Sequence, residues 1–132
     1  MKLITREIDY AVRAIIYLAE KKYGVVSVAE LVDELGITRP FLRKIMQILA
    51  KSGAIESYKS YQGGFRLVKK PEDIYLIDLV EVFQGRFSLN ECLLNKDICP
   101  NQDVCILKSR VEEIEKKVKE ELEKIDLKSL IR

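Results

Sequence analysis

The sequence predicts a mainly α-helical fold with a small β-hairpin. Two amphipathic segments between residues 27 and 51 are joined by a short turn that contains Gly36. A strand, loop and strand pattern follows over residues 55–68. From residue 104 onward, apolar residues recur every three or four positions along a highly charged segment. Together these features predict a winged helix-turn-helix followed by a long C-terminal dimerisation helix.

The first helix is expected from Thr5 to about Lys21. Apolar residues recur there at three- and four-residue intervals, which marks one buried helix face. Thr5 is a suitable N-cap, and Glu7 and Asp9 in the first turn favour the positive end of the helix dipole.

The next two helices are delimited by their capping residues. Ser27 followed by Glu30 fits a capping box, in which each residue bonds to the backbone of the other. Gly36 ends that helix, Thr38 caps the next one, and Pro40 lies in its first turn. We therefore expect a helix-turn-helix, with an ordinary basic helical hairpin as the alternative.

The second of these helices divides into two faces. Its predicted buried residues are Phe41, Leu42, Ile45, Ile48 and Leu49, and its predicted outward residues are Arg39, Arg43, Lys44, Gln47 and Lys51. A recognition helix needs this division, because one side packs on the scaffold while the other contacts bases and phosphates.

A β-hairpin is expected directly after this helix, from strands at 55–58 and 65–68. Such a hairpin forms the wing. Gly63 and Gly64 would form a tight turn, allow close approach to a sugar–phosphate backbone, or do both. The predicted DNA-binding residues of both elements are Ser27, Thr38, Arg39, Pro40, Arg43, Lys44, Tyr58, Lys59, Ser60, Tyr61, Gln62, Gly63 and Gly64.

The charge distribution also favours a polyanionic partner. Residues 1–70 contain thirteen Lys and Arg against seven Asp and Glu, a balance of +6, and residues 71–132 have a balance of −4. Within 39–70 there are eight basic residues and a single acidic one, Glu56. Such a local surplus is typical of nucleic-acid binding.

Beyond residue 70, the pattern predicts a short helix that ends at Gly85 and then a long helix. Along the long helix, a narrow apolar stripe is suited to pairing with a second copy, the alternative being packing across its own domain. The stripe consists of Leu107, Val111, Ile114, Val118, Leu122 and Ile125. Leu127, Leu130 and Ile131 close the chain and are expected to dock on a neighbour.

All three cysteines, Cys92, Cys99 and Cys105, lie in one polar segment of the chain. Grouped thiols amid Asn, Lys, Asp, Pro and Gln are typical of a soft metal or iron–sulfur site. Zinc, a redox disulfide and unligated thiols are the alternatives. Because the chain has no histidine, a fourth ligand would be a carboxylate, a small molecule or a group from elsewhere in the structure.

The length of 132 residues fits one intertwined domain in three parts. These are the DNA-binding region 1–70, the short helix and cysteine segment 71–105, and the dimerisation helix and tail 106–132. We expect a cytoplasmic protein, because the sequence has no run of about 20 apolar residues and no apolar signal region at its start. Without histidine and without a base placed near a thiol, an enzyme is not expected.

With these motifs placed, the sequence resembles the bacterial IscR/NsrR family of iron–sulfur transcription regulators. The resemblance covers the opening residues 3–13, the helix-turn-helix at 29–37, the wing at 63–65, the helix at 77–82 and the three-cysteine segment. It implies a homodimer that binds double-stranded, palindromic promoter DNA. It also implies one [2Fe-2S] or [4Fe-4S] cluster per subunit, with DNA affinity changing when the cluster is lost, oxidised or nitrosylated.

The resemblance also suggests a fourth cluster ligand. Where IscR-like members have a histidine after the last cysteine, this chain has Lys108, which cannot serve while it is protonated. NsrR-like members use an aspartate from the first helix of the other subunit, and Asp9 matches that position. Asp9 is therefore the first candidate and Glu7 the second.

Overall fold

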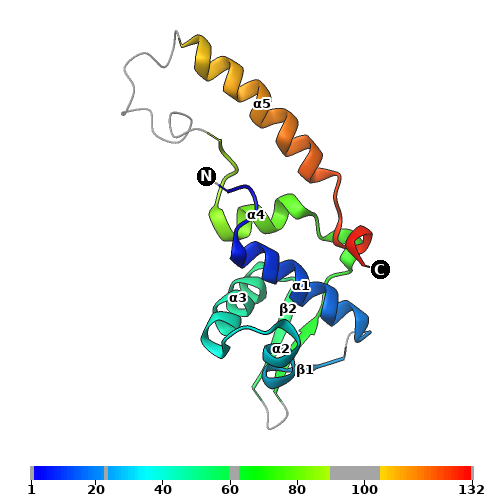
Figure 1. The fold of residues 1–132 in the computed structure, drawn as a ribbon. Helices are drawn as coiled ribbons and strands as arrows, with labels where there is room; N and C mark the ends of the chain where they lie inside the picture. Colours follow the sequence, from blue (N-terminus) through cyan, green and yellow to red (C-terminus); the bar gives the residue numbers. More distant parts are fainter. Residues whose placement is uncertain (1, 23, 60–62, 90–104, 132) are drawn as a thin grey trace.

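The computed structural model describes residues 2–22, 24–59, 63–89 and 105–131. Within these ranges, five α-helices and a three-stranded antiparallel sheet form the fold (Figure 1), and the predicted class, mainly α with a small β-hairpin, is confirmed. The helices are α1 (Arg6–Glu20), α2 (Val28–Leu35), α3 (Arg39–Ser52), α4 (Leu76–Gln84) and α5 (Ile106–Glu123). The strands are β1 (Val26–Ser27), β2 (Ile55–Tyr58) and β3 (Gly64–Leu67), and short 3₁₀ helices lie at Pro71–Asp73 and Leu127–Leu130.

The predicted helix starts are confirmed by side-chain hydrogen bonds. The Thr5 hydroxyl accepts from the Ile8 backbone N–H at 3.3 Å, and the Ser27 hydroxyl accepts from the Glu30 N–H at 3.1 Å. The Thr38 hydroxyl caps α3 in the same way. These bonds satisfy backbone donors that have no partner inside the helix.

The capping box predicted at the start of α2 is only half right, because the hydrogen bond from the Ser27 backbone N–H to the Glu30 side chain is not formed. The Glu30 carboxylate does not return to the Ser27 backbone but accepts a hydrogen bond from the Tyr17 hydroxyl at 2.6 Å, and Lys21 Nζ lies 3.8 Å from it. This hydrogen bond raises the pKa of Tyr17. Glu30 thus links α2 to α1, because tertiary packing brings a stronger donor to its carboxylate than the local backbone N–H.

The buried face of α3 agrees with the sequence pattern. Leu42, Ile45 and Leu49 are fully buried in the main core, and Phe41 and Ile48 are half-buried. Met46 is also fully buried, although the pattern did not include it. The buried face is therefore broader than predicted, because α3 packs against both α1 and α2.

The sheet contains a strand that the sequence pattern did not reveal. β3 lies in the centre, with β1 pairing Val26 with Phe65 on one side and β2 on the other. β1 has two residues, too few for a periodic signal, and forms only because the hairpin lies beside it. β3 also spans residues 64–67 rather than the predicted 65–68.

The position of Gly64 is set by this extra strand. A Cβ atom built on Gly64 would lie 2.0 Å from the backbone oxygen of Val26. Only glycine lets the two strands approach this closely. Gly64 thus has a structural function in the sheet, in addition to its predicted place in the wing.

The C-terminal end of the chain packs on its own fold. Leu122 is 5% exposed and Leu127 is fully buried, so the expectation that Leu127 docks on a neighbour is wrong. Backbone hydrogen bonds of 2.8 Å from Leu76 to Ile125 and from Leu127 to Ile74 fasten this segment beside α4. These bonds and the burial of Leu127 fix the end of α5 on the domain.

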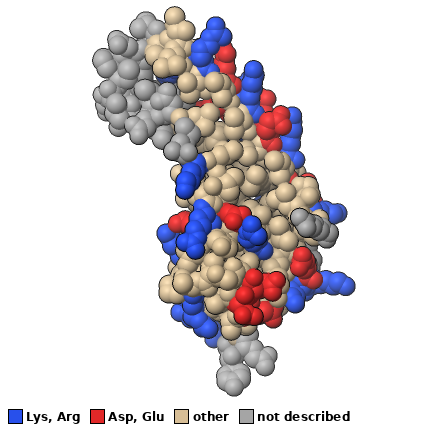
Figure 2. Space-filling model, in the orientation of Figure 1, with Lys and Arg blue, Asp and Glu red and all other residues tan. Residues whose placement is uncertain are grey.

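The N-terminal part of α5 extends away from the rest of the described chain (Figure 1). Ile106, Leu107 and Ile114 are 77%, 69% and 55% exposed, so several large apolar side chains of this helix are uncovered within the described residues. Acidic and basic side chains alternate along one side of this helix (Figure 2). No helix in the described part of the chain is long and apolar enough to cross a membrane.

The close contact at Gly64 gives a stability test. Gly64→Ala is expected to lower the free energy of unfolding by about 1 to 3 kcal/mol, because the new methyl group must displace the Val26 backbone. Urea unfolding followed by circular dichroism measures this change. Ser57→Ala, an exposed position in the same hairpin, should change stability by less than about 0.5 kcal/mol. Equal stability of the two variants would contradict the proposed contact.

Candidate nucleic-acid interface

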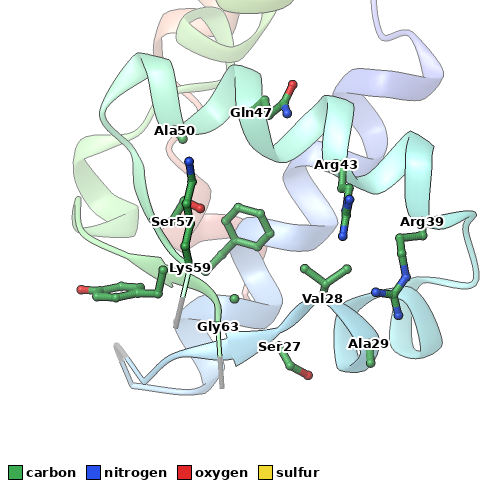
Figure 3. Close-up of a pocket in the computed structure, with 13 residues that line it drawn as sticks. Ser27, Val28, Ala29, Arg39, Arg43, Gln47, Ala50, Ser57, Lys59 and Gly63 are labelled. Atoms are coloured by element: carbon green, nitrogen blue, oxygen red, sulfur yellow. The ribbon is translucent and has the colours of Figure 1, made fainter. Parts of the chain in front are cut away.

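A groove lies between the exposed face of α3, the start of α2 and the β2–β3 hairpin (Figure 3). Its volume is about 650 Å³. The residues that line it are Ser27, Val28, Ala29, Arg39, Arg43, Gln47, Ala50, Ser57, Tyr58, Lys59, Gly63, Gly64 and Phe65. Every charged residue in this lining is basic.

The polar groups of α3 enter the groove from one helix face. Arg39, Arg43 and Gln47 are spaced four residues apart, which aligns them along α3. In Figure 3, Arg39 and Arg43 extend toward Val28 and Ala29 of α2, and Lys59 borders the groove from the hairpin side. This arrangement offers guanidinium and amide donors along one line with a further cation beside them.

Many of the predicted DNA-binding residues meet in this groove. Ser27, Arg39, Arg43, Tyr58, Lys59, Gly63 and Gly64 all line it. Ser60, Tyr61 and Gln62 lie outside the described residues.

Gln47 was absent from the predicted contact set, although its four-residue spacing from Arg43 was a usable signal. Val28, Ala29, Ala50, Ser57 and Phe65 carried no charge signal and reach the groove only through the tertiary fold.

Three predicted contacts lie outside the lining of the groove. Thr38 and Pro40 are exposed at the start of α3. Lys44 is on a different face of α3, where its Nζ lies 2.9 Å from Oε1 of Glu7 in α1. The first turn of α1 thus engages the recognition helix through a residue that the sequence suggested as a second-choice metal ligand.

The outer face of the hairpin carries a polar cluster around Glu56. Glu56 lies directly opposite Arg66 in the antiparallel register, and its Oε2 accepts from Arg66 Nη2 at 2.9 Å. The Tyr58 hydroxyl donates to the same oxygen at 2.8 Å. The Tyr58 and Arg66 hydrogen bonds lower the pKa of Glu56, and the carboxylate in turn raises the pKa of Tyr58. The only acidic residue of the basic segment is thus paired within the hairpin.

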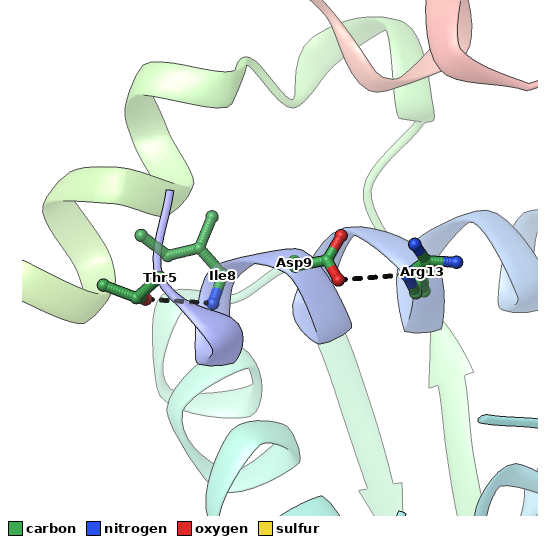
Figure 4. Close-up of polar contacts among 4 residues, drawn as sticks. All are labelled: Thr5, Ile8, Asp9 and Arg13. Atoms are coloured by element: carbon green, nitrogen blue, oxygen red, sulfur yellow. Dashed lines mark hydrogen bonds and ion pairs between the residues drawn. The ribbon is translucent and has the colours of Figure 1, made fainter. Parts of the chain in front are cut away.

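The candidate metal ligands are only partly described. Cys92 and Cys99 lie outside the described residues. Cys105 is the N-cap of α5, where its Sγ accepts from the Lys108 backbone N–H at 3.4 Å. Asp9 is half exposed on α1 and pairs with Arg13 Nε at 3.2 Å (Figure 4). Among the described residues, no group of three or more Cys, Asp, Glu or His side chains converges on one point.

The fold and the basic groove define a winged helix-turn-helix DNA-binding protein. Residues 4–132 match the sequence model of the Rrf2 family, described as an iron-dependent transcriptional regulator. The chain belongs to the Rrf2 family of transcription regulators, and it is a regulator rather than an enzyme.

Individual relatives agree with this assignment. The chain is 33% identical over 126 residues to a putative HTH-type transcriptional regulator of Aquifex aeolicus, covering 94% of this chain and 88% of the relative. It is 31% identical over 134 residues to the regulator NsrR of Bacillus subtilis, covering 100% and 91%.

Solved structures show the same fold. IscR of T. potens superimposes with a TM-score of 0.73 at 26% identity, covering 98% of this chain and 85% of that one. CymR, the global cysteine regulator of B. subtilis, superimposes with a TM-score of 0.72 at 25% identity, covering 98% and 96%. The resemblance to IscR/NsrR-like winged-helix regulators is confirmed.

The hairpin cluster predicts a measurable titration. Because its folded pKa is lowered, Glu56 should titrate below the ordinary glutamate value of about 4.3. The cluster therefore contributes at neutral pH and is lost as the pH falls through the folded pKa. Carbon-detected NMR of the Glu56 carboxyl group measures this pKa.

Substitutions of Tyr58 and Arg66 test which contacts lower the pKa of Glu56. Tyr58→Phe should raise the pKa of Glu56, since the Tyr58 hydrogen bond is the largest cause of its lowering, and Arg66→Gln should also raise it, since it removes a hydrogen bond and a positive charge. A Glu56 pKa that neither substitution changes would show that the two hydrogen bonds are absent in solution.

Proposed function

We propose that this chain is a homodimeric regulator that binds palindromic promoter DNA and whose DNA affinity is controlled by an iron–sulfur cluster. The observation that carries the DNA-binding part is the groove in which Arg39 and Arg43 of α3 and Lys59 of the hairpin lie together. The major groove of B-DNA, about 12 Å wide, admits an α-helix. Arg39, Arg43 and Gln47 are suited to base edges and phosphates there, and Lys59 to the adjacent backbone.

The exposed part of α5 supports a homodimer. Its C-terminal end is occupied by its own domain, since Leu122 is buried there, whereas Ile106, Leu107 and Ile114 have no such cover within the described residues. Val111 and Val118 are half-buried on the same stripe. Pairing of two α5 helices would bury these side chains and place the two α3 helices at a fixed separation, which a palindromic site requires.

The residues present fit an iron–sulfur cluster. Cys92, Cys99 and Cys105 would supply three thiolates, and the backbone N–H that bonds to Cys105 Sγ is the type of donor that surrounds cluster sulfur ligands. A bound cluster supplies a reversible redox and ligand-exchange centre. The family description as iron-dependent supports this assignment. Ligation would hold the segment between α4 and α5 in one arrangement and so set the spacing of the two recognition helices.

Asp9 of the partner subunit is the proposed fourth ligand. Within one chain, the N-terminal end of α5, which carries Cys105, lies away from α1, which carries Asp9 (Figure 1). A second copy could bring its own α1 to this end. Arg13 would release Asp9 for this purpose at small cost, since exposed ion pairs contribute roughly 0 to 1 kcal/mol. An oxygen ligand binds iron less firmly than thiolate, which suits a labile sensor.

A second candidate is a regulator that uses the cysteines for zinc or a thiol–disulfide switch. The likeness to the cysteine regulator CymR of B. subtilis favours it, because CymR and IscR each cover 98% of this chain, with TM-scores of 0.72 and 0.73. Visible absorbance with bound iron and sulfide in anaerobically purified protein separates the two candidates. Colourless protein that binds zinc or forms a reversible disulfide would favour the second.

The central test compares protein with and without the cluster. An operator is first selected from a random duplex library with anaerobically purified protein. Reconstituted protein and the triple Cys92→Ser, Cys99→Ser, Cys105→Ser variant are then titrated with this operator by fluorescence anisotropy. We expect their affinities to differ about tenfold or more, which falls within the roughly 5- to 150-fold range of typical allosteric coupling. Equal affinities would refute cluster control and leave DNA binding intact.

The groove predicts two distinct kinds of DNA contact. Arg43→Ala should cost roughly 1 to 3 kcal/mol on the selected operator and relax sequence preference, if its guanidinium reads a base as we propose. Lys59→Ala should weaken all duplexes similarly and reduce the salt slope by about 1, as expected for a phosphate contact. Anisotropy titrations at several salt concentrations measure both effects. Lys51→Ala, an exposed residue of α3 outside the groove lining, is the control.

A further inference from the structure

The first turn of α1 contacts the recognition helix on a face that is separate from the groove. Oε1 of Glu7 lies 2.9 Å from Nζ of Lys44, between residues 37 positions apart in the sequence. The Arg6 guanidinium carbon lies 4.9 Å from the centroid of the Phe41 ring. The Tyr10 and Phe41 rings meet edge to face, with centroids 5.9 Å apart. Three residues of α1 thus hold two residues of α3.

The two faces of α3 have different partners. Arg39, Arg43 and Gln47 line the groove, whereas Phe41 and Lys44, three residues apart, point to α1. Successive positions on a helix differ by about 100°, so Lys44 and its neighbour Arg43 cannot both point along the same line. Of Arg39, Arg43 and Lys44, only Lys44 forms an ion pair within the described residues.

We propose that Glu7 and Lys44 are positioning residues for DNA binding: their ion pair fixes the orientation of α3, and Lys44 does not serve as a primary DNA contact. This inference rests on the proposed DNA-binding function. It reassigns both residues, since the sequence suggested Lys44 as a DNA contact and Glu7 as a second-choice metal ligand.

Burial is consistent with a positioning role. The Glu7 side chain is 32% exposed and the Lys44 side chain is 60% exposed. The pair is therefore partly screened by solvent and gives a modest effect rather than a large one. Its position matters because Phe41, beside it, lies within the first turn of α3, next to Arg39 and Arg43. A small rotation of this turn would misplace both guanidinium groups, which are the most geometry-dependent contacts in the groove.

Substitution of Glu7 gives the decisive result. A purely electrostatic effect and a positioning effect change the affinity for DNA in opposite directions. Glu7→Gln removes a negative charge near the DNA-binding face, so simple electrostatics predicts tighter binding of every duplex. The positioning role predicts weaker binding of the selected operator, by roughly two- to fivefold, the range expected for an exposed ion pair. Tighter or unchanged operator binding by Glu7→Gln would overturn the inference.

A double-mutant cycle tests whether the two residues act together. Lys44→Gln should weaken operator binding about as much as Glu7→Gln, and the double variant should be no worse than either single one. Lys44→Arg keeps charge and reach and should bind nearly as tightly as the unaltered protein. A phosphate contact at Lys44 predicts instead that Lys44→Gln lowers the salt slope by about 1. We expect the slope to be unchanged, and a drop of that size would contradict the proposal.

Two controls keep the outcomes distinct. Iron and sulfide content of Glu7→Gln should equal that of the unaltered protein, whereas a loss of iron would identify Glu7 as a ligand and overturn the inference. Thermal unfolding should remain cooperative, and hydrogen exchange should become faster at the start of α3, a readout that needs no DNA. If the unaltered protein binds no duplex at low salt, the proposed function fails, while this exchange measurement still tests the ion pair.

Discussion

The packing of α3 against α1 and α2 is the constraint on which the DNA-binding surface depends. Leu42, Ile45, Met46 and Leu49 are fully buried, and their burial fixes both the position and the rotation of the helix. Arg39, Arg43 and Gln47 are then exposed because they occupy the remaining face. The guanidinium groups of Arg39 and Arg43 reach the same groove because the buried residues on the opposite face of α3 fix the rotation of the helix about its axis.

The hairpin depends on the same constraint through β1. This two-residue strand directly precedes α2 and pairs with β3, so the wing is joined to the first helix of the helix-turn-helix. Gly64 permits the close approach of β3 to β1. Glu56 and Arg66 lie opposite each other in the register of β2 and β3. Lys59 consequently faces the groove from a hairpin that is held at both of its strands. The wing and the recognition helix therefore contribute to one continuous surface.

The C-terminal helix has two different surroundings along its length. Leu122 and the following Leu127 pack into the core, while Ile106, Leu107 and Ile114 remain exposed within the described residues. The buried end fixes α5 on the domain, and the exposed end is the surface that we propose a second copy covers. In the sequence, the three cysteines follow α4 and precede or cap α5, the helix that we propose pairs with a second copy.

The sequence by itself determined the helix boundaries, the two faces of α3, the hairpin and the family. Capping residues such as Ser27, Thr38 and Gly36 act over three or four residues. The apolar periodicity that marks a buried face can be recognised within the sequence of one helix. The tertiary structure alone decided β1, the exact fit at Gly64, the place of Leu127 in its own core, and the partners of Glu30 and Lys44. Each of these depends on residues far apart in the chain, and local patterns contain no information about which distant group arrives to complete a contact.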